Sequence, residues 1–215
     1  MTIHLTAVPR TLARVLAVAL SALALCACSA LHPSVVPSTA FYALQNAKVA
    51  PSGPTAAQAA TAPLTLIISP VRAASGYDSQ RIIYVREAHK LEYFARSEWV
   101  DTPARMLGPL LVDAIEKVGA FRAVALTPAS ATGDVRLDTV IERIHQDFQT
   151  RPSRVHFTLR SYLVDEKTRR VMAWREFEGE AEAPSDDPYG GVLAANQAVS
   201  GVLVDLAQFL KSSVK

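Results

Sequence analysis

The chain has 215 residues, with 22 Lys and Arg against 20 Asp and Glu. This near balance gives no sign of the clustered, uncompensated basic surface that binding of polyanions such as nucleic acids requires. Its two cysteines, Cys26 and Cys28, are too few for an iron–sulfur cluster or a cysteine-based zinc site. The length is sufficient for an ordinary hydrophobic core.

Residues 1–27 have the pattern of a cleaved signal peptide. Arg10 and Arg14 make its start positive, and residues 15–27 carry no charge and are rich in Leu, Ala and Val. A helix that stays in a bilayer needs roughly 20 apolar residues, so this stretch is too short to remain there. Cleavage would remove both arginines and no acidic residue, which leaves the mature chain formally neutral.

The segment Leu25-Cys26-Ala27-Cys28 has the form of a lipoprotein cleavage site, and we predict Cys28 as the lipid-attachment residue. Cys26 fits less well, because Leu25 would then occupy the position of the small residue. An ordinary secretory signal cut at an Ala-x-Ala-like site is the alternative. Acyl chains on Cys28 would hold the chain at a membrane. By similarity to sorted lipoproteins, Ser29 in place of Asp favours the outer membrane.

Residues 28–62 are predicted to form a lipidated tether. They are dominated by Ala, Pro, Ser and Thr, with Lys48 as their one charge. Such a composition buries little apolar surface and is typical of extended linkers. The exception is the apolar island 41–44, which predicts a short strand docked on the main domain, followed by a loop over 46–62. A tether over 28–39 would span ~20 Å as a flexible coil.

The folded domain is predicted over residues 63–215. Residues 64–68 are apolar, largely β-branched and bounded by prolines, which favours a buried strand. Residues 81–86 and 90–94 flank a short polar turn and predict a β-hairpin.

Clear start and stop residues mark a first helix. Asp101 or Thr102 can cap its N-terminus, Pro103 suits its first turn, and Gly119 suits a left-handed C-terminal position. Pro109 lies inside the apolar periodic pattern, where it removes a backbone hydrogen bond. We therefore expect either a kink or a helix start nearer residue 107.

Three strands and a second helix follow. Alternating patterns predict strands over 135–148, with a bulge in its second half, over 155–163 and over 171–174. An amphipathic pattern over 189–214 predicts a helix. This order predicts an α+β fold, in which an antiparallel or mixed β-sheet carries two α-helices on one face.

The sequence offers no constellation for catalysis or metal binding. His145 and His156 fall among polar positions of predicted strands and are expected to be surface histidines. The acidic row Glu176, Glu178, Glu180 and Glu182 has the spacing of one exposed strand face. The two tryptophans, Trp99 and Trp174, are expected in the core or half-buried, whereas an exposed one would mark a partner surface. We predict neither catalytic residues nor cofactors.

Several short motifs occur in a recognisable order along the chain. They are Phe41-Tyr42-x-Leu44, 69–72, 77–86 and 99–103. Together they resemble the ABC-type transport auxiliary lipoproteins, in which a Tyr-Tyr-x-Leu-like start precedes a Tyr-Leu-Asp-like turn, a Gln-Ile-Val-x-Arg-like strand and a Trp before the first helix. The turn at 75–78 departs from that pattern, because Asp78 follows Tyr77 directly.

The resemblance implies an accessory of an ABC system that contains a mammalian-cell-entry-type substrate-binding protein. Such systems move phospholipids or other hydrophobic molecules between the inner and outer membranes. The resemblance implies that the auxiliary lipoprotein docks the transporter at the periplasmic face of the outer membrane. It leaves open whether the protein forms a homo-oligomer. The sequence has no G-x-x-x-x-G-K-[ST] motif, so an ATPase would be a separate subunit. A lipid-binding shuttle and an outer-membrane assembly factor or activator are the alternatives.

Overall fold

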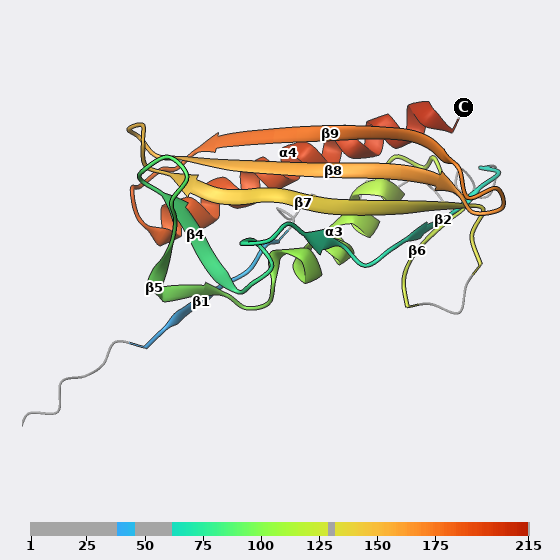
Figure 1. Ribbon diagram of the computed structural model, residues 1–215. Helices are drawn as coiled ribbons and strands as arrows, with labels where there is room; N and C mark the ends of the chain where they lie inside the picture. Colours follow the sequence, from blue (N-terminus) through green and yellow to red (C-terminus); the bar gives the residue numbers. More distant parts are fainter. Residues whose placement is uncertain (1–37, 46–61, 129–131, 215) are drawn as a thin grey trace, which may run out of the picture. The chain divides into compact units, whose positions relative to one another are not determined.

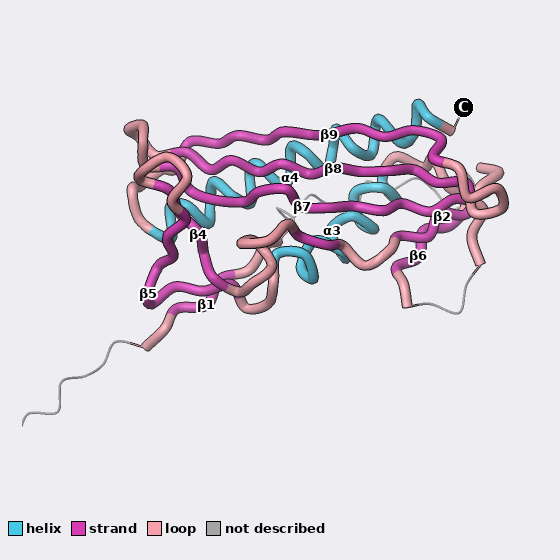
Figure 2. The backbone as a smooth tube through the Cα atoms, viewed as in Figure 1, coloured by secondary structure: helices cyan, strands magenta, loops and turns pink. Residues whose placement is uncertain are grey.

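The computed structural model describes residues 38–45, 62–128 and 132–214, which belong, apart from Ser38, to the compact unit Thr39–Lys215. The described residues contain strands and two helices (Figure 1 and Figure 2). In chain order these are β1 (Ala40–Tyr42), β2 (Thr65–Ile68), β3 (Arg72–Ala73), β4 (Arg81–Val85), β5 (Leu91–Trp99), α3 (Pro103–Lys117), β6 (Ala123–Leu126), β7 (Val135–Asp147), β8 (Arg154–Asp165), β9 (Val171–Glu182) and α4 (Pro188–Ser213).

Strand β7 is the centre of a mixed sheet. On one side it pairs with β8 along its length, antiparallel, and β8 pairs in the same way with β9. On the other side it pairs in succession with β2, β3 and β4, all parallel. Strand β6 extends the sheet beyond β2, and the β4–β5 hairpin carries β1 beyond β5.

Both helices pack on the same face of this sheet, as Figure 2 shows. Helix α4 lies along β8 and β9, while α3 packs against α4 and β6. By length and apolar composition α4 could cross a membrane, but half of its most apolar stretch is buried inside the unit. We interpret it as a core helix. The α+β class with two helices on one face is confirmed.

The two faces of the sheet differ because side chains alternate along each strand. On β7 the inward residues begin with Val135, Leu137 and Thr139. A β-bulge between Ile141 and Arg143 then shifts the alternation, so that Ile144 faces the core next. The predicted bulge is thus confirmed. The opposite face carries most of the charged residues of β7, β8 and β9.

The first helix begins where its capping residues predict. The hydroxyl of Thr102 accepts a hydrogen bond from the N–H of Arg105, and Gly119 adopts a left-handed φ of 61°. The helix runs through Pro109, so a start near residue 107 is wrong. Leu107 and Leu111 are fully buried on either side of the proline, and this burial offsets the lost hydrogen bond.

Several other details bear on the expectations. Strand β6 was not predicted, and β9 continues through Glu182 rather than ending near Trp174. Trp99 lies in the core, with 3% of its surface exposed, as expected. Trp174 is 61% exposed, so the expectation that it is at least half-buried is wrong.

Candidate functional site

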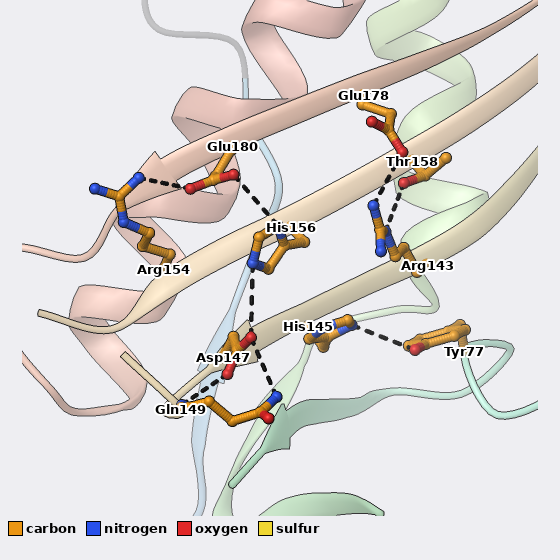
Figure 3. Close-up of polar contacts among 10 residues, drawn as sticks. All are labelled: Tyr77, Arg143, His145, Asp147, Gln149, Arg154, His156, Thr158, Glu178 and Glu180. Carbon is orange, nitrogen blue, oxygen red and sulfur yellow. Dashed lines mark hydrogen bonds and ion pairs between the residues drawn. The ribbon is translucent and has the colours of Figure 1, made fainter. Parts of the chain in front are cut away.

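The outer face of the sheet carries a ladder of ion pairs. The glutamate row of β9 points outward as predicted, and arginines of β7 and β8 neutralise much of it. Arg160 lies 2.6 Å from Glu176, Arg143 lies 3.0 Å from Glu178, and Arg154 lies 2.6 Å from Glu180 (Figure 3 draws the last two). Paired and open to water, these carboxylates lack the desolvated cleft that acid–base catalysis needs.

A cluster of rings lies beside this ladder (Figure 3). The hydroxyl of Tyr77 shares a 3.3 Å hydrogen bond with Nδ1 of His145, and the His145 ring lies 5.7 Å from that of His156. His156 in turn lies 3.8 Å from Asp147 and 3.7 Å from Glu180. Both histidines face outward but are half-buried, which corrects the expectation that they lie at the surface.

Burial decides the protonation of this cluster. It lowers the pKa of His145 to about 4, with further lowering from the charges of His156 and Arg143. It also raises the pKa of the Tyr77 phenol. His145 is therefore neutral and Tyr77 protonated near pH 7. The cluster holds the 74–80 turn against β7 rather than presenting a reactive group.

An apolar patch lies on the outer face at the start of β9. We call Tyr162, Val171, Met172 and Trp174 the tryptophan patch. Trp174 stacks on Tyr162 with ring centroids 6.3 Å apart and planes at 26°. Val171 and Met172 are exposed beside it. Exposed Trp, Tyr and Met are characteristic of partner-binding surfaces.

A second apolar surface lies between the segment that begins with β1 and the start of α4. It is an open groove of about 730 Å³, which we call the β1/α4 groove. Its lining residues carry no charge and are Phe41, Tyr42, Ala43, Gln45, Tyr189, Val192, Leu193, Asn196, Gln197 and Ser200. Phe41, Tyr189 and Leu193 are also strongly exposed.

Hydrogen bonds hold the β1 segment beside α4. The side-chain amide of Asn196 accepts from the N–H of Gln45 at 2.7 Å and donates to the carbonyl of Ala43 at 3.3 Å. The rings of Tyr42 and Tyr189 lie 6.3 Å apart. The groove is thus built by two segments about 150 residues apart in the sequence, which no local pattern reveals.

The predicted lipid-attachment residue Cys28 lies outside the described residues. So do the predicted signal peptide 1–27 and most of the tether 28–62. Among the residues that the structure describes, no three His, Cys, Asp or Glu side chains form a group that could hold a metal ion.

The family to which the chain belongs follows from comparison with known proteins. A sequence model of the family described as "ABC-type transport auxiliary lipoprotein component" matches residues 42–207. The chain belongs to this family. No curated protein matches the sequence significantly.

Two solved structures share the fold of this auxiliary lipoprotein. Protein XCC0632 from Xanthomonas campestris is 22% identical, with a TM-score of 0.70, over 81% of this chain and 96% of its own. An uncharacterized protein is 12% identical, with a TM-score of 0.62, over 81% of this chain and 99% of its own. At these identities the likeness establishes the fold alone.

Three of the four motifs that resemble the auxiliary lipoprotein family are joined by hydrogen bonds at one end of the sheet. The N–H of Val100 donates to the carbonyl of Tyr42 at 2.8 Å, and the N–H of Trp99 donates to the carbonyl of Gln80 at 2.7 Å. The Gln80 side chain closes the set by donating to the carbonyl of Val100 at 2.8 Å. These motifs therefore attach β1 to the body of the domain.

Proposed function

We propose that this auxiliary lipoprotein is a non-catalytic docking component of an ABC-type intermembrane transport system. In this proposal acyl chains on Cys28 attach it to the periplasmic face of the outer membrane. Its partner is a mammalian-cell-entry-type component, and its system moves phospholipids or other hydrophobic molecules. The family and the sequence around Cys28 support this role.

Tight packing between β7 and α4 favours an adaptor over a shuttle that would hold an acyl chain there. The cavity between β7 and α4, lined by residues such as Trp99, Ile144 and Ala195, has a volume of about 10 Å³. That is barely room for one water molecule. A small-molecule site usually needs roughly 300–1,000 Å³. An acyl chain held between this part of the sheet and α4 is therefore disfavoured.

The tryptophan patch is the surface that we propose for the transporter partner. Binding energy at protein interfaces concentrates in a few Trp, Tyr and Arg side chains. Exposed Trp174 stacks on half-buried Tyr162, and Arg160 with its ion pairs lies two residues from Tyr162 on β8. Catalysis is not part of the proposal, because the carboxylates and rings of the outer face serve structural contacts.

Removal of the attachment residue tests the proposal in cells. Cys28→Ala should move the protein from the membrane fraction to the soluble periplasmic fraction, and intermembrane lipid movement should fall. A Cys26→Ala variant is the matched control and should stay membrane-bound. If the Cys28→Ala protein remains in the membrane fraction, the attachment is wrong. If it is released and lipid movement is unchanged, the docking role is wrong.

A further inference from the structure

We infer that the β1/α4 groove rests on the lipid surface of the membrane to which Cys28 attaches the chain. The inference rests on the proposed attachment and adds an orientation to it. The occupant of the groove is then the periplasmic leaflet of that bilayer, and the tryptophan patch at the other end of β9 points away from it.

The side chains at the groove have the chemistry of a membrane interface. Phe41 is 61% exposed, and Tyr189 and Leu193 are exposed beside it. Tyr combines an apolar ring with a polar tip, which suits the boundary between acyl chains and headgroups. Three large exposed apolar groups around one open groove would otherwise contact water.

The length of chain between Cys28 and the groove supports a lipid occupant. Ser38, where the described structure begins, lies ten positions after Cys28. Even fully extended, such a segment spans at most ~35 Å. Strand β1 follows directly and supplies Phe41 to the groove. A lipid on Cys28 therefore keeps this end of the domain near the bilayer.

The charges around the groove specify the kind of lipid surface. None of its lining residues is charged, and among the described residues Glu98 lies opposite Phe41 and Asp187 caps α4. The groove therefore suits zwitterionic headgroups and does not need anionic ones. Contact between the groove and the lipid surface should therefore not depend on the salt concentration.

The opposite position of the tryptophan patch follows from the run of the chain. Trp174 lies near the start of β9, whereas Tyr189 lies just beyond its end, at the start of α4 (Figure 1). Glu182 lies eight positions after Trp174 in β9, which corresponds to ~26 Å along the strand. With the groove on the membrane, the patch projects toward the periplasm.

Fluorescence of the anchored protein tests the orientation. The mature chain has one cysteine, so Cys28 can be coupled to a maleimide lipid in vesicles of phosphatidylethanolamine and phosphatidylcholine, without relying on cellular lipidation. In the Phe41→Trp, Trp174→Phe variant, brominated acyl chains should at least halve the emission of the introduced tryptophan. The chain without substitutions serves as the comparison, because its exposed tryptophan is Trp174, whose emission should not be quenched. Buried Trp99 is present in both proteins and contributes the same background emission.

Two further variants test whether the groove side chains are needed for contact with the bilayer. Tyr189→Ser with Leu193→Ser, in the Phe41→Trp, Trp174→Phe background, should abolish most of the quenching. Val204→Ser, an exposed α4 position beyond the groove, should leave it unchanged. Absence of quenching at position 41, or equal quenching at positions 41 and 174, overturns the inference. The attachment proposal is unaffected by either result, because Cys28 is coupled chemically.

Discussion

The side-chain oxygen of Asn196 in α4 accepts a hydrogen bond from the backbone N–H of Gln45 at 2.7 Å. This bond connects the C-terminal helix to the segment that follows β1. The same amide donates to the carbonyl of Ala43, and Leu44 between the two is buried. Together with the pairing of β1 with β5, this contact joins the β1 segment to the rest of the domain.

Asn196→Ala should therefore loosen the β1 segment. We expect a loss of about 1 kcal/mol in the free energy of unfolding, because backbone groups of Ala43 and Gln45 lose their partner. Amide hydrogen exchange should accelerate at Gln45 more than at core strands. The neighbouring groove residue Gln197 provides the control, and Gln197→Ala should change neither quantity. Unchanged exchange at Gln45 in Asn196→Ala would contradict this role.

A matched pair of glycines tests the packing of α4 on β9. A Cβ at Gly179 would lie 2.6 Å from the carbonyl oxygen of Ala198 and 2.8 Å from Cγ2 of Val202. Gly179→Ala must therefore push α4 away from the sheet, and we expect a loss of about 1–3 kcal/mol in urea unfolding. At Gly201, on the exposed side of α4, an added Cβ meets no described atom within 4 Å.

Gly201→Ala should accordingly be neutral or stabilise the protein by up to about 1 kcal/mol, since Ala favours a helix over Gly. Equal effects of the two substitutions would show that α4 does not approach β9 as closely as described.

The histidine cluster predicts a pH dependence of stability. Burial holds the pKa of His145 at about 4 in the fold, below the ordinary value of 6.5. Between these values the unfolded chain binds more protons, so the free energy of unfolding falls as the pH is lowered from 6.5 toward 4. Tyr77, His156, Arg143 and Asp147 face the ring. Because the ring is partly open to water, we expect a loss of about 1–2 kcal/mol.

Urea unfolding at about pH 4.5 and about pH 7 measures this loss, and it should be smaller in His145→Gln. His89 lies exposed in the β4–β5 turn, so His89→Gln should retain the full dependence. An NMR titration that places the His145 pKa near 6.5 in the folded protein would contradict the account.

Local patterns in the sequence predicted the elements whose residues carry their own start, stop or alternation. Thr102 caps the first helix, and the bulge predicted in the second half of the strand over 135–148 is the observed one. Strand β6 has no such pattern, because four apolar residues acquire strand geometry only by pairing with β2.

The interaction surfaces were harder to predict from the sequence than the helices and strands. Trp174 shares the even-numbered positions of the glutamate row, so strand alternation could have placed it on the exposed face. That inference needed β9 to be recognised as one long strand. The β1/α4 groove depends on contact between segments that are distant in the sequence, such as Ala43 and Asn196, and only tertiary packing brings them together.

The most direct test of the docking role is photo-crosslinking in cells from position 174. Trp174→p-benzoylphenylalanine should leave the fold intact, because the side chain is exposed, and should crosslink a mammalian-cell-entry-type transporter component, identified by mass spectrometry. The same substitution at Val204 is the control and should not. Crosslinking of that component from position 174 alone is the predicted result. Crosslinks from position 174 to phospholipid, or to no component of a transporter, would contradict the account.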